Sequence, residues 1–151
     1  MISFQEAKLI IQKKIFELRT EIVDLNNSAD RILAQDIVSN FPSPKFDNSA
    51  MDGFAVRSFD TIGASIKNII SLKNIGLSSA GQPSNLTLMS GECVQCMTGA
   101  KIPDGADAII MVEDTSGFSN DENVQIMIEA KRGKHIRFKG EEIKEGETLI
   151  R

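Results

Sequence analysis

The sequence predicts an α+β fold in which a β-rich domain of short strands is inserted into a small domain of mixed, partly helical structure. Apolar residues recur at helical spacing within residues 4–18. After residue 53, short apolar runs alternate with glycine, asparagine and serine, a pattern typical of strands and turns. We therefore expect residues 1–43 and 138–151 to share the first domain and residues 44–137 to form the inserted one.

The first element is predicted to be a helix from about Phe4 to Leu18. Ser3 and Glu6 have the spacing of a capping box, in which the serine hydroxyl accepts a hydrogen bond from the first turn and the glutamate reaches back. Apolar side chains at positions 4, 7, 10 or 11, 15 and 18 then share one face. The sequence therefore predicts an amphipathic helix here.

Shorter elements are predicted between this helix and the first proline run. Thr20 to Leu25 alternates well enough for a short strand, and Asn27 and Ser28 can cap a second helix through Asp30 to Ala34. The Pro42-Ser43-Pro44 run then ends regular structure, because proline lacks a backbone donor and disfavours helix in the residue before it.

The rest of the chain predicts a series of short strands joined by loops. Residues 78–83 and 117–123 are rich in turn-forming residues and are expected to be loops. A further strand is expected to begin at Thr148. The predicted strands between these points are Phe54–Arg57, Ile66–Leu72, Cys93–Thr98, Ala108–Glu113, Val124–Glu129 and His135–Phe138.

Composition narrows the class of protein. The chain is 41% hydrophobic and 25% charged, which is typical of a folded soluble protein, and its net charge of −4 includes no evident basic face. All of its aromatic residues are phenylalanine, so we expect no nucleic-acid partner. No apolar run approaches the roughly 20 residues of a membrane span, and no signal peptide is evident. We therefore expect no membrane partner. The two cysteines do not suggest a disulfide framework, so we expect a cytoplasmic location.

Two polar stretches at strand ends are the candidate site. Phe46 to Val56 packs two carboxylates, an amide, a hydroxyl and a glycine between the proline run and a strand. Met97 to Ala108 runs from a strand through Thr98-Gly99-Ala100 into a proline turn and a new strand. A hydroxyl beside unobstructed backbone N–H groups suits an oxyanion. The same residue types dominate ordinary turns, so composition by itself does not distinguish a functional site from a simple turn.

Taken in order, these stretches resemble the amino-terminal region of the molybdopterin molybdenumtransferase family, which includes the bacterial MoeA proteins and a domain of gephyrin. The likeness covers essentially the whole chain and predicts the MoeA N-terminal fold. The residues that carry it are Phe46-Asp47-Asn48-Ser49-Ala50-Met51-Asp52-Gly53-Phe54-Ala55-Val56, Ala80-Gly81, Met97-Thr98-Gly99-Ala100 with Pro103, Gly105, Ala106, Asp107 and Ala108, Glu113-Asp114, and Gly140-Glu141-Glu142-Ile143 with Gly146.

The resemblance implies an enzyme of molybdenum cofactor biosynthesis. Such a transferase inserts molybdate into adenylated molybdopterin and releases AMP, with Mg²⁺ as cofactor. The resemblance further implies an elongated homodimer, whose active cleft lies between this part of one subunit and a molybdopterin-binding α/β domain of the other. A molybdopterin adenylyltransferase is the implied protein partner.

The resemblance also assigns roles to individual residues. It makes Asp52 and Thr98 the catalytic pair, with Asp52 as an indirect magnesium contact. The other matched positions are expected to bind substrate or to shape the loops that do: Asn48, Ser49, Gly99, Arg137, Glu141 and Glu142.

Elementary chemistry agrees with these roles. Breaking a phosphoanhydride bond while delivering an oxyanion requires positioning and charge neutralisation more than covalent help. The carboxylate of Asp52 can orient a hydrated magnesium ion, which prefers oxygen ligands. The Thr98 hydroxyl and the Gly99 amide can donate to a phosphate or molybdate oxygen. Arg137 suits phosphate because its fork of donors matches that geometry.

The chain departs from the family pattern in its third motif and in its extent. Phe138 interrupts a basic run between Arg137 and Lys139, and Glu142 stands where aspartate is usual. The sequence ends in mid-pattern without the α/β domain or the carboxy-terminal β domain, which suggests a piece of something longer. We expect this part alone to be half an active site, without turnover. The alternative, from another class, is a non-catalytic dimerisation or docking module.

The cysteines and the single histidine are expected to be structural. Cys93 and Cys96 fit C-x-x-C, but they fall inside a predicted strand, on opposite faces, where core packing is favoured over redox chemistry or metal binding. His135 is expected to be a surface or hydrogen-bonded residue, because four zinc ligands are not available.

Overall fold

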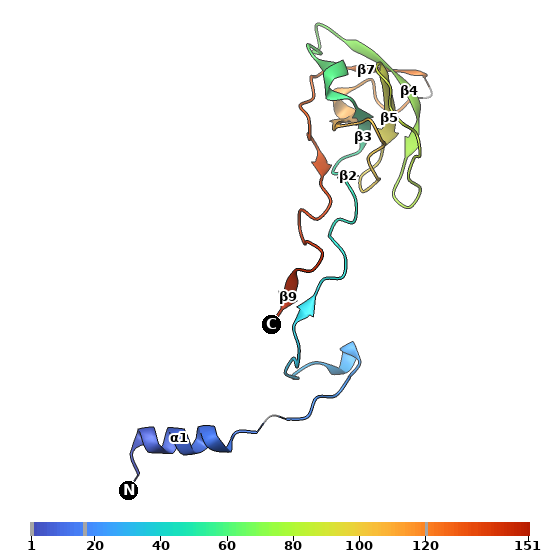
Figure 1. Ribbon diagram of the computed structural model, residues 1–151. Coiled ribbons are helices and arrows are strands. Elements are labelled where there is room, and N and C mark those ends of the chain that lie inside the picture. The colour runs from blue at the N-terminus through green and yellow to red at the C-terminus, as the bar shows by residue number, and fades with distance from the viewer. Residues whose placement is uncertain (1, 17, 120) are drawn as a thin grey trace. The chain divides into compact units, whose positions relative to one another are not determined.

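A computed structural model describes residues 2–16, 18–119 and 121–151 (Figure 1). The chain divides into two compact units, Met1–Ile37 with Ile150–Arg151, and Val38–Leu149. Helix and sheet are both present, so the predicted α+β class is confirmed. The domain limits expected from the sequence, at residues 43 and 138, stay a prediction.

The first unit contains one α-helix, α1, over Phe4–Lys14. The predicted capping box is present: the Ser3 hydroxyl accepts from the Glu6 amide at 3.2 Å, and the Glu6 carboxylate accepts from the Ser3 amide at 2.8 Å. The helix ends four residues before the predicted Leu18, because Ile15 adopts an extended conformation. No described residue of α1 is buried, so no packing extends the helix beyond what its cap and sequence support.

Two further predictions for the first unit are wrong. Residues 20–24 form no strand, and Leu25–Asn27 forms a short 3₁₀ turn, η1. The helix predicted through Asp30 to Ala34 is replaced by irregular backbone, with a turn at Asp30 and a bend at Ala34. Asp30 has a φ of +62°, a left-handed conformation that an α-helix does not accommodate. The spacing of apolar residues favoured a strand and a helix here, but in the described structure neither segment has a neighbouring strand or a buried face to support it.

The second unit is built on a curled five-stranded sheet in the order β6-β3-β5-β4-β7 (Figure 1). The strands are β3 (Gly53–Val56), β4 (Ile70–Ser78), β5 (Glu92–Cys96), β6 (Ala108–Met111) and β7 (Asn123–Ile126). Strand β3 is antiparallel to both β5 and β6, whereas β4 is parallel to β5 and antiparallel to β7. Thr115, after β6, bridges to Ile126 of β7, which brings the two ends of the sheet together.

The five predicted strands of this sheet exist, with shifted bounds. Strand β4 begins at Ile70 rather than Ile66, because residues 65–68 close a tight turn through paired backbone hydrogen bonds. It then continues to Ser78, the first residue of a predicted loop. The predicted loop at 117–123 includes residue 120, which lies outside the described residues, and its last residue, Asn123, begins β7.

Short strand pairs lie outside the main sheet. Strand β2 (Asn48–Ser49) pairs with β8 (Ile136–Arg137), so the strand predicted at His135–Phe138 is present but shorter. Strand β1 (Ile37–Val38) pairs with β9 (Thr148–Ile150), which confirms the strand expected at Thr148. Among the described residues, no helix has the length and apolar character to span a membrane.

The sheet buries an apolar cluster on each face. Phe54, Val56 and Cys93 belong to the larger cluster, and Ala55 and Cys96 belong to the smaller one. Both cysteines are free and fully buried, and burial raises the pKa of Cys93 to about 12 and that of Cys96 to about 11. Their thiols therefore stay protonated and pack in the core, as the alternation of the strand predicts.

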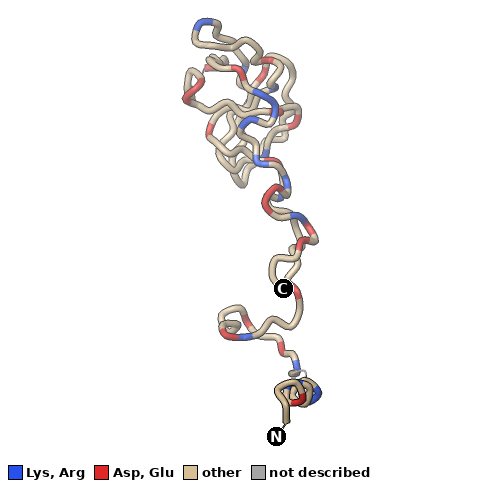
Figure 2. Tube along the Cα trace, turned by 90° about the vertical axis from the view of Figure 1, so that its left-hand side faces the viewer, with Lys and Arg blue, Asp and Glu red and all other residues tan. Residues whose placement is uncertain are grey.

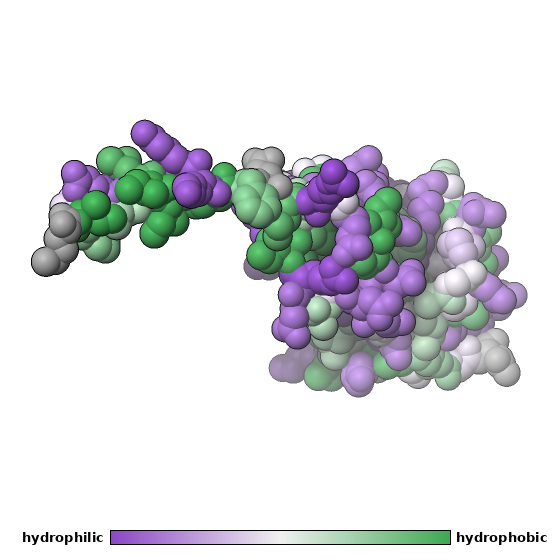
Figure 3. Space-filling model, turned by 90° about the horizontal axis from the view of Figure 1, so that it is seen from below, coloured by the Kyte–Doolittle hydropathy of each residue, from purple (hydrophilic) through white to green (hydrophobic). Residues whose placement is uncertain are grey.

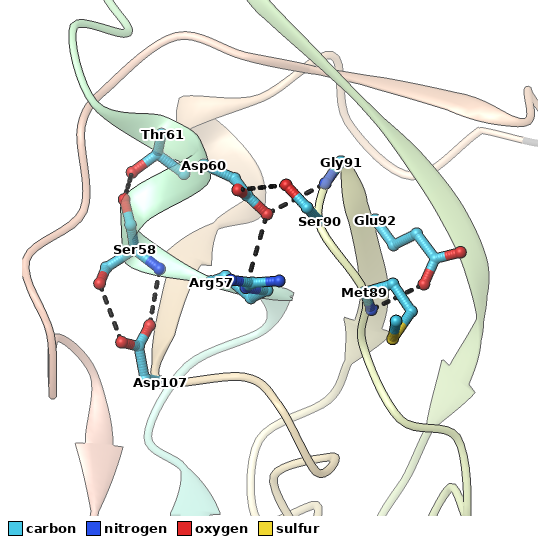
Figure 4. A network of polar contacts seen from close by, with 9 residues as sticks. All are labelled: Arg57, Ser58, Asp60, Thr61, Met89, Ser90, Gly91, Glu92 and Asp107. Atoms are coloured by element: carbon cyan, nitrogen blue, oxygen red, sulfur yellow. Dashed lines mark hydrogen bonds and ion pairs between the residues drawn. The ribbon is translucent and has the colours of Figure 1, made fainter.

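A polar network fixes the short helix η2 (Ser58–Thr61) to the sheet (Figure 4). The Asp60 carboxylate accepts from the Ser90 hydroxyl at 2.9 Å and from the Gly91 amide at 3.0 Å. On the other side of η2, the Asp107 carboxylate accepts from the amide and hydroxyl of Ser58. These bonds satisfy backbone donors at η2 and at the start of β5.

Candidate functional site

The two polar stretches found in the sequence lie side by side and are joined by backbone hydrogen bonds. The Ser49 amide donates to the Ala100 carbonyl at 3.0 Å, and the Gly99 amide donates to the Ser49 carbonyl at 2.8 Å. The Ile102 amide continues this ladder by donating to the carbonyl of Asp47 at 3.0 Å. Residues 50 positions apart in sequence are thereby held as neighbouring strands.

Asp52 and Thr98 meet at the end of this ladder. One oxygen of the Asp52 carboxylate, Oδ1, accepts both from the Thr98 amide and from the Thr98 hydroxyl, each at 2.7 Å. These two bonds, the backbone one first, hold the pKa of Asp52 below its ordinary value of 3.8, so the exposed carboxylate is ionised at neutral pH. The Val112 amide also donates to the Asp52 carbonyl, which anchors the backbone of the turn.

Both loops depend on glycine next to these residues. Gly99 has a φ of +79°, the left-handed region that side chains rarely adopt. Gly53 opens β3, and a Cβ there would lie 1.9 Å from the Ile110 carbonyl oxygen of β6. The close approach of β3 and β6 therefore requires glycine directly after Asp52.

Ser49 and Asn48 are both buried. Ser49 is fully buried; its hydroxyl donates to the Met51 carbonyl at 2.5 Å and accepts from the Met51 amide, which shapes the turn that leads to Asp52. Asn48 is only 6% exposed, and its side-chain amide donates to the Phe46 carbonyl at 3.2 Å. Its Oδ1 is buried without a hydrogen-bond partner in the described part of the chain.

Two cations flank Asn48. Arg137 of β8 lies opposite Asn48 in register, and Lys101 bridges to Asn48 from the other side. Directly paired residues project their side chains from the same face of a sheet, so the exposed side chains of Arg137 and Lys101 share a face with Asn48. Sequence reasoning identified Arg137 and missed Lys101, because the isolated bridge between Lys101 and Asn48 is a tertiary feature.

The two glutamates of the third motif accept hydrogen bonds within the protein, Glu141 in a local turn and Glu142 from a distant part of the chain. The Glu141 carboxylate accepts from the Phe138 amide at 2.8 Å, and the Glu142 carboxylate accepts from the Ser43 hydroxyl at 2.9 Å. The latter bond joins the third motif to the proline run at the start of the second unit. The structure thus brings Arg137 beside Asn48 and gives each glutamate a partner outside the Asp52–Thr98 pair.

Two depressions lie beside the ladder on the Asp47 side. The larger has a volume of about 380 Å³ and the smaller about 140 Å³, and Asp47, Ile102 and Ala106 line both. Lys101 and Lys139 contribute cations to the larger one. Neither depression is lined by Asp52 or Thr98. Asp52 and Thr98 are themselves exposed, so a ligand bound there needs further groups to enclose it.

Asp52 presents a single exposed carboxylate at this point of the surface. Among residues 2–16, 18–119 and 121–151, no three or more His, Cys, Asp or Glu residues gather to hold a metal ion. The Oδ2 atom of Asp52 has no hydrogen bond within the described residues, and a single carboxylate oxygen suits a water of a hydrated magnesium ion. Figure 2 shows Lys and Arg interspersed with Asp and Glu along the chain, so attraction of an anion depends on local groups.

Solved structures of MoeA proteins share this fold. A molybdopterin biosynthesis moeA protein from Pyrococcus horikoshii OT3 superposes with a TM-score of 0.87 at 34% identity, covering all of this chain and 40% of that one. The curled sheet and its two joined loops thus define a MoeA-type amino-terminal region.

The chain belongs to the family described as MoeA N-terminal region (domain I and II), whose sequence profile matches residues 2–151. A molybdopterin molybdenumtransferase of Staphylococcus epidermidis is 38% identical over 149 residues, which are 99% of this chain and 35% of that protein. Molybdopterin molybdenumtransferase 2 of Mycobacterium tuberculosis is 39% identical over 150 residues, 36% of its length. The chain thus spans about a third of the curated relatives it matches.

Proposed function

We propose that this chain is the amino-terminal part of a molybdopterin molybdenumtransferase of molybdenum cofactor biosynthesis, and that Asp52 and Thr98 act in its active site. The reaction inserts molybdate into adenylated molybdopterin and releases AMP. The observation that carries this proposal is the pair of 2.7 Å hydrogen bonds from Thr98 to Asp52 Oδ1, which joins the two family motifs at one exposed point.

The hydrogen bonds favour Asp52 over Thr98 as the group that contacts the reacting ligands. Both the Thr98 hydroxyl and the Gly99 amide, expected from the sequence to donate to an oxyanion, already donate within the protein, to Asp52 and Ser49. That donor role is therefore not available in this arrangement. Thr98 instead orients the Asp52 carboxylate and keeps it ionised, and its Oγ1 retains lone pairs for a ligand donor.

Magnesium, when bound with the substrates, neutralises charge that builds up on phosphate and molybdate oxygens. Asp52 would hold it through a metal-bound water, since one exposed carboxylate oxygen is free of other hydrogen bonds in the described residues. Arg137 and Lys101 supply positive charge on the face they share with Asn48, which suits an anionic substrate. Glu141 and Glu142 keep the third motif folded so that Arg137 is held in β8.

We further propose a homodimer that uses apolar side chains of the first unit. Phe4, Ile11, Ile15 and Ile22 are 78%, 64%, 70% and 104% exposed. Figure 3 shows apolar side chains, in green, gathered along the α1 segment. So much exposed apolar surface on a helix with no buried residue is typical of an association surface. The same surface also fits the alternative function, a non-catalytic dimerisation or docking module. For the transferase we further propose a cytoplasmic location and a molybdopterin adenylyltransferase as a protein partner.

A chimera tests the proposed function. Residues 1–151 would replace the matching region of the Staphylococcus epidermidis relative, and the chimera would be assayed for AMP release from adenylated molybdopterin in the presence of molybdate and magnesium. We expect turnover by the chimera and none by the 151-residue chain alone, because Asp52 and Thr98 are exposed and need further groups to enclose the substrates. A folded chimera without activity would contradict the transferase proposal and favour the docking module. Turnover by the 151-residue chain alone would contradict the expectation that this chain forms only half of the active site.

A further inference from the structure

The loop that carries Thr98 is fastened at both ends to one buried residue, Ser78. Ser78 is the last residue of β4 and is fully buried. At the start of the loop, the Met97 amide donates to the Ser78 carbonyl at 3.0 Å. At its end, the Ser78 hydroxyl donates to the Lys101 carbonyl at 2.9 Å. Thr98 and Gly99 thus lie between two attachments to the same residue.

The Ser78 hydroxyl also connects this loop to the turn after β4. The Ser84 amide donates to Ser78 Oγ at 3.2 Å, so the hydroxyl both accepts and donates. The turn lies close to the site, since a Cβ on Gly99 would be 3.9 Å from the Cβ of Ala80. A buried hydroxyl is costly unless it is hydrogen-bonded, and here both bonds go to loop backbone rather than to the sheet.

We propose that Ser78 is a positioning residue of the Asp52–Thr98 site: its buried hydroxyl fixes the end of the loop Met97–Lys101, so that the amide and hydroxyl of Thr98 both reach Asp52 Oδ1. The catalytic meaning of this role rests on the proposed function, whereas the coupling from Ser78 to Asp52 does not. Without the hydroxyl, the Lys101 carbonyl loses its donor, and the loop gains freedom where Thr98 must be held.

Thr61 provides a matched control within the same chain. It is also fully buried, its hydroxyl donates to the Ser58 carbonyl at 2.8 Å, and it accepts from the Ala130 amide at 3.0 Å (Figure 4 shows the Ser58 bond). Ser78→Ala and Thr61→Val therefore each remove one donated and one accepted hydrogen bond from a buried hydroxyl. Only Ser78 is bonded to the loop of Thr98.

The test is the pKa of Asp52, followed by NMR during an acid titration of the 151-residue chain, together with the urea midpoint of each variant. We expect both variants to lower the urea midpoint. We expect Ser78→Ala alone to raise the pKa of Asp52 toward its ordinary value, because the Thr98 donors that lower it are then held less firmly. An unchanged Asp52 pKa in Ser78→Ala, or an equal rise in Thr61→Val, would overturn the proposal.

Ser78→Cys covers the case in which Ser78→Ala does not fold. A thiol is of similar size and is a weak donor, so a smaller rise of the Asp52 pKa is expected, and no rise would overturn the proposal.

In the active chimera, Ser78→Ala should lower kcat about tenfold with little change in KM, as loss of positioning does, while Thr61→Val keeps both near wild type. If the unsubstituted chimera folds but releases no AMP, the proposed function fails, while the titration still decides the role of Ser78.

Discussion

At the scale of single residues, Asp52 combines ionisation with a fixed orientation. One carboxylate oxygen is held by two donors of Thr98, and the other is available to solvent or ligand in the described structure. An ionised carboxylate at a charge-neutralising site is preorganised when its donors come from a rigid backbone. The ladder through Ser49, Ala100 and Gly99 supplies that backbone.

Substituting Asp52 by Asn tests the importance of its charge. The amide oxygen still accepts from Thr98, so the fold should remain and the negative charge is lost. We expect kcat of the chimera to fall by about 10²-fold or more, the usual effect of removing one electrostatic group from an active site. Steady-state AMP release measures the rate, and a circular dichroism melt checks the fold. A wild-type rate in a folded Asp52→Asn chimera would remove Asp52 from the mechanism.

The link between Thr98 and Asp52 also predicts a pH dependence of stability. Because folding lowers the pKa of Asp52, its contribution to stability is present above the unfolded value near 3.8 and is lost as the pH falls through the folded pKa. Thr98→Val removes the hydroxyl donor, so it should destabilise the chain near neutral pH and lose this part of its effect in acid. Urea unfolding at a series of pH values measures the difference.

Thr98→Ser is the control for this experiment, since it keeps both the amide and the hydroxyl. It should match the wild-type chain at every pH. A Thr98→Val penalty that stays constant from neutral pH into acid would show that the loss of stability does not depend on the bond from the hydroxyl to the ionised Asp52 carboxylate.

At the scale of elements, the approach of β3 and β6 decides where the Asp52 turn lies. Gly53↔Met111 and Phe54↔Ile110 are paired in register, and the ideal Cβ position of Gly53 overlaps the Ile110 carbonyl oxygen at 1.9 Å. Backbone atoms on both strands would have to move to admit a methyl group. The loss of stability caused by a side chain at position 53 would therefore come from displacing the paired strands β3 and β6.

Gly53→Ala should consequently destabilise the second unit strongly, by about 2 kcal/mol or more, the range of overpacked buried sites. Gly76→Ala is the matched control on β4, where the added Cβ meets only the end of the flexible Leu86 side chain, at 2.6 Å. We expect a cost there of less than about 1 kcal/mol, because that side chain can change rotamer. Urea unfolding compares the two, and equal costs would contradict the packing argument.

At the scale of the whole molecule, the apolar surface of the first unit predicts self-association. Sedimentation at a series of concentrations should show a dimer of the 151-residue chain. Ile11→Lys, at a position 64% exposed on α1, should weaken the dimer, because a charge then enters an apolar contact. Ile66→Lys, at a position 81% exposed in the second unit, is the control and should leave the dimer intact.

A monomer at every concentration would contradict the proposal that the first unit carries the dimer contact. An equal effect of both lysine substitutions would point to general aggregation through apolar residues instead. Either result would leave the fold and the Asp52–Thr98 pair unchanged, because they are defined by hydrogen bonds within one chain.

The sequence by itself determined the local features whose cause lies within a few residues. The capping box of Ser3 and Glu6, the short apolar strands around Phe54 and Cys93, and the strand at Thr148 all follow from side-chain chemistry and spacing. The family also follows from the sequence, because its motifs are long and occur in order. Local patterns failed at Thr20–Leu25, where apolar alternation has no partner strand to pair with.

Only the tertiary structure decided how the site is assembled. Asp52 and Thr98 are 46 residues apart, and their contact depends on the pairing of two loops that no spacing rule predicts. The same pairing commits the Thr98 hydroxyl and the Gly99 amide to protein acceptors, places Lys101 beside Asn48, and fastens the loop to Ser78. The physical reason is that a hydrogen-bond donor has one proton to give, and only the folded chain determines which acceptor lies within reach.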